Sequence, residues 1–212
     1  MRLESVERYK GKTFCITLET GQRIYLHEEF VAEARLATDM DVPVPALNAL
    51  LRRSEERRAR ERALYLLEYR DHSYAELVQK LEKNYHESIA IKTADRMAEL
   101  GLLDDARYAK RLAASLIEGK RLGMRRARFE LSQKGLDREL IDEVLAPYEE
   151  EDSSVERIVE IIQRKYMRSL GDPKGEQRAI AGLARMGHDY TDIRAALELC
   201  LEELAEMEEN EE

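Results

Sequence analysis

The sequence 126-RARFELSQKGLDRELIDEVL-145 decides the fold, because it returns as 178-RAIAGLARMGHDYTDIRAAL-197. At a constant offset of 52 residues, seven positions of the two stretches are identical. Gly135 and Gly187 stand at the same place, and an aspartate follows each glycine two residues later. A glycine here can take the positive φ that ends a helix, and an aspartate can cap the next helix. The pattern therefore predicts two helices joined by a tight turn, present twice.

A weaker third copy lies upstream at 76-ELVQKLEKNYHESIAI-91. At an offset of 50 residues, Leu81 and Ile91 align with apolar residues of the copy at 126–145, and Tyr85 stands where the later copies have glycine. The residues 73-SYAE-76 form a capping box that opens the first helix of this weak copy.

Each copy follows another helical stretch, so the repeating unit is three helices within about 50 residues. One such unit has a single apolar stripe per helix and buries little surface alone, so stacking of neighbouring units must supply stability. We therefore expect a mainly α protein, built as an elongated, curved array of tandem three-helix repeats. The predicted repeats span residues 46–101, 102–150 and 151–204, and an acidic tail spans residues 205–212.

The first 45 residues predict a different structure. β-Branched and aromatic residues at 13–18 and 23–26 flank the turn 19-ETGQ-22, which favours a small antiparallel β meander. A short helix is expected near residues 28–36, followed by a break at 42-VPVP-45 and a helix over residues 46–69. Residues 1–45 therefore form a β meander plus a short helix, too small to be stable without the helices that follow.

Composition agrees with a helical, cytoplasmic protein. The chain of 212 residues is 43% hydrophobic and 37% charged, and it contains no Trp. No run approaches the 18 apolar residues of a membrane span, and the N-terminal residues form no signal peptide, so we expect no contact with a membrane. Cys15 and Cys200 lie far from any second cysteine or histidine at ligand spacing, so we interpret both as reduced thiols, mostly buried.

Charge is distributed unevenly along the chain. The net charge is -9, yet the last fifteen residues alone contain eight Glu and no Lys or Arg. The segment 107–128 holds eight cations against one acid, Glu118. These cations repel one another unless an acidic surface neutralises them, so the segment is a candidate partner-binding site. The candidate residues are Arg107, Lys110, Arg111, Lys120, Arg121, Arg125, Arg126, Arg128 and the neighbouring aromatic Phe129.

Two features of the basic residues have a structural alternative. Phe129 could stack on a base or enter a protein pocket, or it could pack against the neighbouring repeat. The second basic run, 52-RRSEERRARER-62, alternates in sign and is more typical of a solvated helix face.

No arrangement of residues predicts catalysis. The four histidines His27, His72, His86 and His188 lie in or beside turns, and we interpret them as solvated. Asp104 and Asp105 precede a helix, where acids complement its dipole, rather than forming an acid and base pair. We therefore expect no enzyme activity, no metal, no cofactor and no small-molecule substrate.

Several motifs in a fixed order carry a family resemblance. They are 61-ERALYLLEYR-70, 73-SxxELxxKL-81, 102-LLDDxRYA-109, Gly123 and 130-ELxxKG-135. In this order they resemble the RecX family of bacterial recombination regulators, over about residues 55–200. The chain departs from the family pattern at Tyr85, in place of the usual glycine, and in its acidic tail.

The resemblance implies a tandem array of three-helix units that binds the RecA recombinase in the groove of its filament on single-stranded DNA. It further implies that the protein restrains the ATPase and strand exchange of RecA. Because the body of the chain is close to neutral and its tail is acidic, we expect only weak or indirect contact with single-stranded DNA. We expect a monomer. Two alternatives stay open: a helical-repeat protein that acts on DNA directly, and a helical-repeat scaffold for an unrelated protein.

Overall fold

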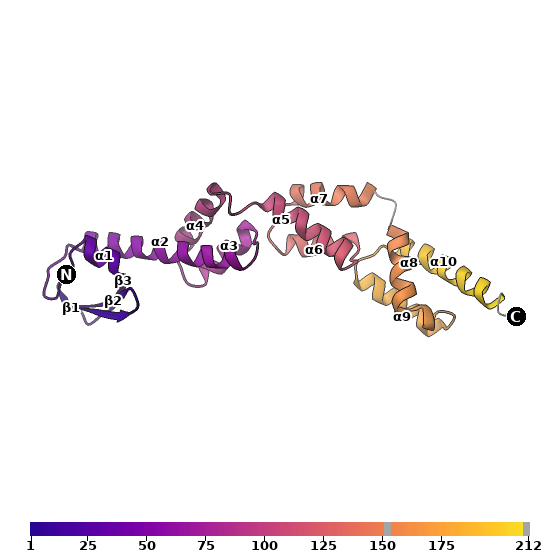
Figure 1. Cartoon of the computed structure of the whole chain (residues 1–212), viewed down its shortest axis with the longest axis horizontal. Helices are drawn as coiled ribbons and strands as arrows, with labels where there is room; N and C mark the ends of the chain where they lie inside the picture. Colours follow the sequence, from indigo (N-terminus) through magenta and orange to yellow (C-terminus); the bar gives the residue numbers. More distant parts are fainter. Residues whose placement is uncertain (151–153, 210–212) are drawn as a thin grey trace. The chain divides into compact units, whose positions relative to one another are not determined.

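The chain is mainly helical, and three β-strands lie at its N-terminal end. This computed structural model describes residues 1–150 and 154–209, so the start of the third predicted repeat and the end of the predicted tail lie partly outside the described residues. The helices run in chain order from α1 to α10 (Figure 1). Their bounds are α1 Glu28–Glu33, α2 Val44–Tyr69, α3 Tyr74–Glu82, α4 Glu87–Glu99, α5 Asp105–Ala114, α6 Met124–Ser132, α7 Arg138–Glu150, α8 Ser154–Lys165, α9 Pro173–Arg185 and α10 Tyr190–Glu209.

The chain divides into two compact units, and the division runs through α3. The first unit comprises Met1–Asp71 and Leu77–Leu103, and the second comprises His72–Glu76 and Asp104–Glu212. A mainly α fold with a small N-terminal antiparallel sheet confirms the predicted fold class.

The N-terminal sheet is the predicted meander. Its strands are β1 Leu3–Lys10, β2 Thr13–Leu18 and β3 Arg23–His27, and each pairs antiparallel with the next. One face of the sheet buries Leu3, Ile16 and Leu26 in a core that also contains Leu47 of α2. The sheet is thus stabilised by the long helix that follows it.

The long helix α2 buries different sides in its two halves. Its first half buries Leu47 and Ser54 on one side, while its second half buries Ala59 and Ala63. At 100° per residue, the two alanines lie roughly 140° to 180° around the helix from Ser54. The first half packs on the sheet, and α2 also contacts α4. The helix starts at Val44, earlier than predicted, because Pro43 and Pro45 occupy the cap and first turn, where no N–H is required.

In the weak first copy, the turn between the two helices is one residue shorter than in the later copies. Its second helix, α4, buries Ala90 and Ala94, whereas Ile91 is 39% exposed. The predicted alignment of Ile91 with a buried position of the later copies is therefore wrong. The cause is a shorter turn: the cap of α4, His86, comes five residues after the buried Leu81, whereas the corresponding interval in the later copies is six residues.

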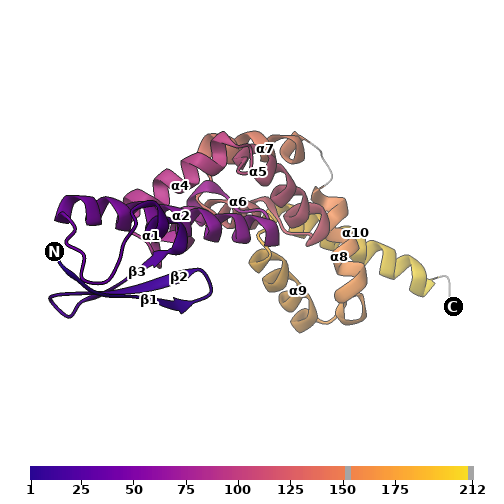
Figure 2. The same cartoon turned by 60° about the vertical axis from the view of Figure 1, so that its left-hand side comes forward.

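The second unit contains two three-helix cores. Helices α5, α6 and α7 bury one cluster around Leu131 and Leu145, and α8, α9 and α10 bury another around Ile162 and Leu183. Figure 2 shows α8, α9 and α10 grouped in this way. A π-helical turn, Ser115–Gly119, extends α5, and a 3₁₀ turn, Met167–Ser169, follows α8.

The predicted turn chemistry is confirmed in both later copies. Gly135 has a φ of 71° and Gly187 has a φ of 90°, each just past a helix end. Asp137 accepts a hydrogen bond from the N–H of Leu140 at 2.8 Å, and Asp189 accepts one from the N–H of Thr191 at 3.0 Å.

The same two glycines also meet the first turn of another helix. A Cβ atom on Gly135 would collide with Ala75 of α3, and a Cβ atom on Gly187 would collide with the backbone of Arg126 in α6. We call each of these contacts a turn joint. In both joints, the carbonyl before the glycine accepts a hydrogen bond from the residue that precedes the helix.

The donors in the two joints are equivalent positions of the repeat. Ser73 Oγ donates to the carbonyl of Lys134, and the N–H of Gly123 donates to the carbonyl of Met186 at 3.0 Å. Ser73 and Gly123 are 50 residues apart, the offset of the first two copies. Tyr85, which replaces the glycine in the first copy, does not have a positive φ.

Two of the four histidines are not solvated. His27 and His86 cap α1 and α4 through Nδ1, as turn residues do. His72 and His188 are only 4% and 6% exposed, so their predicted solvation is wrong. They are buried because they lie where packed helices begin, which a local reading of polar neighbours does not reveal. Both cysteines are free, Cys200 buried and Cys15 partly buried.

Among the described residues, no helix is long and apolar enough to cross a membrane.

Candidate partner-binding surface

Helix α5 carries the first group of predicted cations on one side. Asp104 caps the helix by accepting the N–H of Arg107 at 2.8 Å, and Ala109 and Ala113 are fully buried. Arg107, Lys110 and Arg111 are three and four residues apart, so they share the exposed side. Capping by Asp104 confirms the structural interpretation of that acid.

Asp105 also has a structural partner. Its carboxylate accepts the N–H of Tyr74 at 2.8 Å. Burial raises the pKa of the Asp105 carboxyl, and the hydrogen bond from Tyr74 opposes that rise. The carboxylate thus joins α5 to the start of α3 within the second unit.

The loop between α5 and α6 holds Lys120 and Arg121 in different surroundings. Lys120 is exposed, whereas Arg121 has a φ of 55° and is partly buried. The Arg121 carbonyl lies 3.0 Å from Nε2 of His188, and its guanidinium forms an ion pair with Glu160 at 2.7 Å. Arg121 therefore contributes to packing between α6 and the last three helices.

Helix α6 carries Arg125 and the aromatic side chain of the predicted site. Arg126 pairs with Glu130 at 2.6 Å, and its guanidinium lies 5.3 Å from the ring centroid of Phe129. Phe129 is 49% exposed, so half of the ring remains in contact with solvent. The interpretation of Phe129 as a residue packed against a neighbouring repeat is not supported by this exposure.

Arg128 is neutralised by acids of α7. It pairs with Asp142 and, at 3.0 Å, with Glu149. The hydrogen bond to Asp142 raises the pKa of the Arg128 guanidinium, and burial opposes the rise. This side chain connects α6 to α7.

Seven of the eight predicted cations therefore fall into two classes. Arg121, Arg126 and Arg128 form ion pairs with acids outside the segment. Within residues 1–150 and 154–209, four of the other cations form no ion pair, and we call them the open cations. They are Arg107, Lys110, Lys120 and Arg125, all exposed.

Sequence reasoning missed a group of exposed side chains on α2. Arg58, Arg62, Tyr65 and Tyr69 are all exposed, Tyr65 at 61% and Tyr69 at 83%. Their spacings of four, three and four residues place them on one side of the helix. That spacing could have identified them from the sequence, but the alternating charges of residues 52–62 favoured the interpretation of a solvated helix face.

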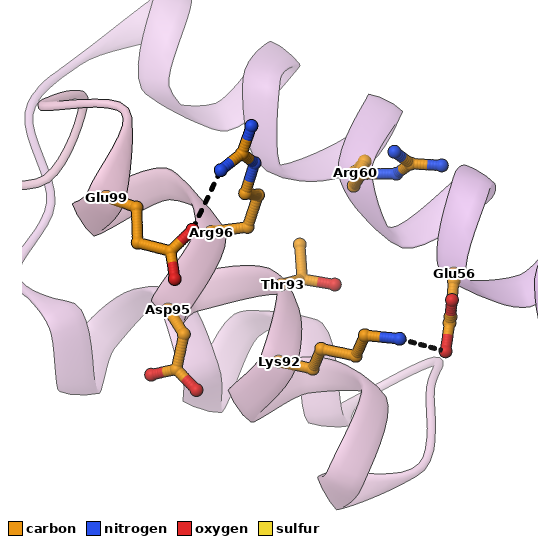
Figure 3. Close-up of a pocket in the computed structure, with 7 residues that line it drawn as sticks. All are labelled: Glu56, Arg60, Lys92, Thr93, Asp95, Arg96 and Glu99. Carbon is orange, nitrogen blue, oxygen red and sulfur yellow. Dashed lines mark hydrogen bonds and ion pairs between the residues drawn. The ribbon is translucent and has the colours of Figure 1, made fainter.

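A cavity of about 390 Å³ lies between α2 and α4 in the first unit (Figure 3). Lys92 pairs with Glu56 at 2.7 Å, and Arg96 pairs with Glu99 at 2.8 Å, as the dashed lines in Figure 3 show. Thr93 lies between the two pairs and is buried. The two ion pairs leave the lining close to neutral, so the cavity offers no concentrated charge for a ligand. Among the described residues, no cluster of three His, Cys, Asp or Glu could hold a metal ion.

Two family models match the chain. Residues 59–97 match the first three-helix domain of RecX, and residues 104–145 match the second. The regulatory protein RecX of Chlorobium phaeobacteroides (strain BS1) is 34% identical over 147 residues, which cover 68% of this chain and 95% of that protein. The chain belongs to the RecX family.

A second RecX protein agrees with this assignment, and solved structures share the fold. The regulatory protein RecX of Mycobacterium ulcerans (strain Agy99) is 32% identical over 159 residues, covering 72% of this chain and 88% of the relative. A crystal structure of regulatory protein RecX matches with a TM-score of 0.64 at 20% identity, covering 93% of this chain and 98% of that one.

A crystal structure of RecX from Lactobacillus salivarius matches with a TM-score of 0.60 at 21% identity, covering 69% of this chain and 96% of that one. Both structures share the fold. All nine predicted site residues fall within the match to the second RecX domain.

Proposed function

We propose that this protein is a non-enzymatic regulator of the RecA recombinase. It binds the RecA filament on single-stranded DNA as a monomer in the cytoplasm, and it restrains the ATPase and strand exchange of RecA. Membership of the RecX family carries the proposal, because the relatives are named regulatory proteins. The resemblance in the order of motifs supplies RecA as the partner.

The open cations are the part of the predicted site that we propose contacts the partner. A cation that already has an acidic partner gains little from a second acid, whereas an exposed cation without one can pair with an acidic surface across an interface. Arg107 and Lys110 lie on α5, Lys120 lies in the loop, and Arg125 lies on α6. Phe129, half exposed on α6, supplies apolar contact beside them.

The test is the DNA-dependent ATPase of RecA filaments with and without this protein. We expect the wild-type protein to suppress the ATPase and the variant Arg107→Glu/Lys110→Glu/Arg125→Glu to lose most of that suppression. The control is Arg164→Glu/Lys165→Glu/Lys174→Glu, which makes the same charge change at exposed residues of α8 and α9. Circular dichroism and melting of both variants show that the fold is retained.

Each outcome decides between the candidate functions. Equal loss in both variants would show a dependence on total charge, and full suppression by the first variant would move the contact surface elsewhere. If the wild-type protein has no effect on RecA, the proposed partner is wrong. A purified protein that hydrolyses ATP or cleaves DNA alone, and loses that activity on point mutation, would contradict its non-enzymatic role.

A further inference from the structure

The exposed side chains Arg58, Arg62, Tyr65 and Tyr69 of α2 form a narrow band, which we call the α2 stripe. At 100° per residue the four positions lie within about 60° of one another around the helix. The guanidinium of Arg62 lies 5.3 Å from the ring centroid of Tyr65. The stripe therefore combines two cations and two aromatic rings on one exposed side of a single helix.

The α2 stripe lies on the same side of α2 that is buried in the first half of the helix. Leu47 and Ser54 lie on this same side, and Leu47 belongs to the core shared with the β meander. Beyond Ser54 the buried side changes to that of Ala59 and Ala63, so the original side is left to solvent. Tyr65 and Tyr69 are 61% and 83% exposed, and aromatic rings grouped on one exposed side of a helix mark a candidate interaction site.

The arginines of α2 differ in their ion pairs. Arg52 pairs with Glu56, Arg53 with Glu33, and Arg57 with Glu29 and Glu61. In the part of the chain that the structure describes, Arg58, Arg60 and Arg62 form no ion pair, and of these three Arg58 and Arg62 lie on the stripe. Glu55 and Glu61 lie beside the stripe, and Glu61 is already engaged by Arg57 at 3.0 Å. The run 52–62 is therefore not uniformly a solvated, self-neutralised face.

We propose that the α2 stripe binds single-stranded nucleic acid directly. Bases stack on the rings of Tyr65 and Tyr69, and the guanidinium groups of Arg58 and Arg62 bind phosphate oxygens. Exposed rings beside cations are the combination that single strands require, because every base has a face to stack and every nucleotide carries a charge. A duplex keeps its base faces covered and can use only the two arginines.

The dimensions of the stripe fit a short length of single strand. Tyr65 and Tyr69 are four residues apart, about 6 Å along the helix at 1.5 Å per residue. The whole stripe extends over twelve residues, from Arg58 to Tyr69, or about 16 Å along the helix. The two rings are therefore spaced for bases that are adjacent or nearly so, and the arginines continue toward the neighbouring phosphates.

This inference does not depend on RecA or on the open cations, because all four residues lie in the first unit. Its test uses naked nucleic acid. We expect the full-length protein to bind a fluorescent oligothymidylate with a shallow salt dependence. Two phosphate contacts predict a log-log slope near -1.4, at roughly 0.7 per contact.

The variants separate stacking from charge. Tyr69→Ala should weaken binding to the oligothymidylate by roughly 5-fold to 150-fold, the range for loss of one stacked base. Arg58→Glu/Arg62→Glu should weaken it and bring the salt slope near zero. The matched control is Arg60→Glu/Lys83→Glu, which makes the same charge change at two exposed cations of the first unit that lie away from the stripe and form no ion pair within the described residues.

A spectroscopic readout reports contact at the stripe itself. The chain has no Trp, so Tyr69→Trp introduces a single indole. Its fluorescence should be quenched by an oligothymidylate and left nearly unchanged by a duplex of equal length.

Three results would overturn the proposal. The first is unchanged affinity in both Tyr69→Ala and the stripe double variant. The second is equal binding of duplex and single strand with no quenching of the indole. The third is loss of binding in the variant of the open cations together with a slope near -2.8, at roughly 0.7 for each of the four open cations, which would place DNA on residues 107–128. Suppression of RecA can succeed or fail in each case, so the two proposals are tested separately.

Discussion

Gly187 meets two separate requirements, and each can be measured. Its φ of 90° disfavours any side chain, and a Cβ atom there would collide with the backbone of Arg126. Gly171 has almost the same φ, 88°, but a Cβ atom on it would meet open space. The pair therefore separates backbone strain from the contact in the turn joint.

We expect Gly171→Ala to lower the free energy of unfolding by about 1 to 2 kcal/mol, the cost of the left-handed conformation. Gly187→Ala should cost about 1 to 3 kcal/mol more, because the added methyl group overpacks a joint made of backbone. Denaturant unfolding of both variants measures the difference. Equal costs would show that the joint yields without strain.

At the scale of the helix, α2 has a polar atom in an unfavourable place. Ser54 is fully buried, and its hydroxyl has no hydrogen-bond partner among the described residues. Burying a hydroxyl without a partner costs free energy, and Ala favours a helix more than Ser does. We expect Ser54→Ala to raise the free energy of unfolding by up to about 1 kcal/mol, measured by denaturant unfolding.

Ser73→Ala is the control with the opposite sign. Ser73 Oγ accepts the N–H of Glu76 at 3.1 Å and donates to the carbonyl of Lys134. Losing this cap should lower the free energy of unfolding by about 1 kcal/mol. Destabilisation by Ser54→Ala would show that its hydroxyl has a partner, such as a bound water.

Helix ends and strands could be predicted from sequence because their causes are local. Gly135 ends α6 through its own φ, and Asp137 caps α7 through a residue three positions later. The meander likewise follows from residues next to its turns. The ion pairs of the candidate site could not be predicted in the same way. Arg121 meets Glu160 across 39 residues, and only the packed fold brings them together.

The change of buried side along α2 was hidden for a related reason. Leu47 and Ala63 lie on different sides of α2, because the two halves of the helix pack against different partners. The apolar residues therefore show no single period along the whole helix, and the sequence resembled that of a solvated helix. The exposure of Tyr65 and Tyr69 depends on where the sheet and α4 pack on α2, and the sequence alone does not show this.

For the whole molecule, the stability of the second unit should depend on pH through His188. Burial lowers the pKa of the His188 imidazole, Arg157 lowers it further, and the hydrogen bond to the Arg121 carbonyl and the charge of Asp192 oppose this. The pKa in the unfolded chain is near the ordinary value of about 6.5. Below that pH the unfolded chain takes up a proton that the folded protein resists.

The stability that His188 contributes is thus present above about pH 6.5 and lost as pH falls through the lower pKa of the folded state. We expect the melting temperature to fall between pH 7.5 and pH 5, and to fall less in His188→Gln than in the wild-type protein. Melting followed by circular dichroism at several pH values checks this. An identical fall in both proteins would place the pH dependence on other groups.

The turn joints restrict the order in which the repeats can follow one another along the chain. A copy with glycine at its turn can follow another copy, because the turn leaves room for the first turn of that neighbour's helix. The copy with Tyr85 has a side chain at that place, and the residues before it in this sequence form the meander, α1 and α2 rather than another three-helix copy. A gene in which the second copy was duplicated should therefore still encode a continuous array, whereas one in which the first copy was moved behind another should not. The array can grow by internal duplication, but its first module cannot change places with the others.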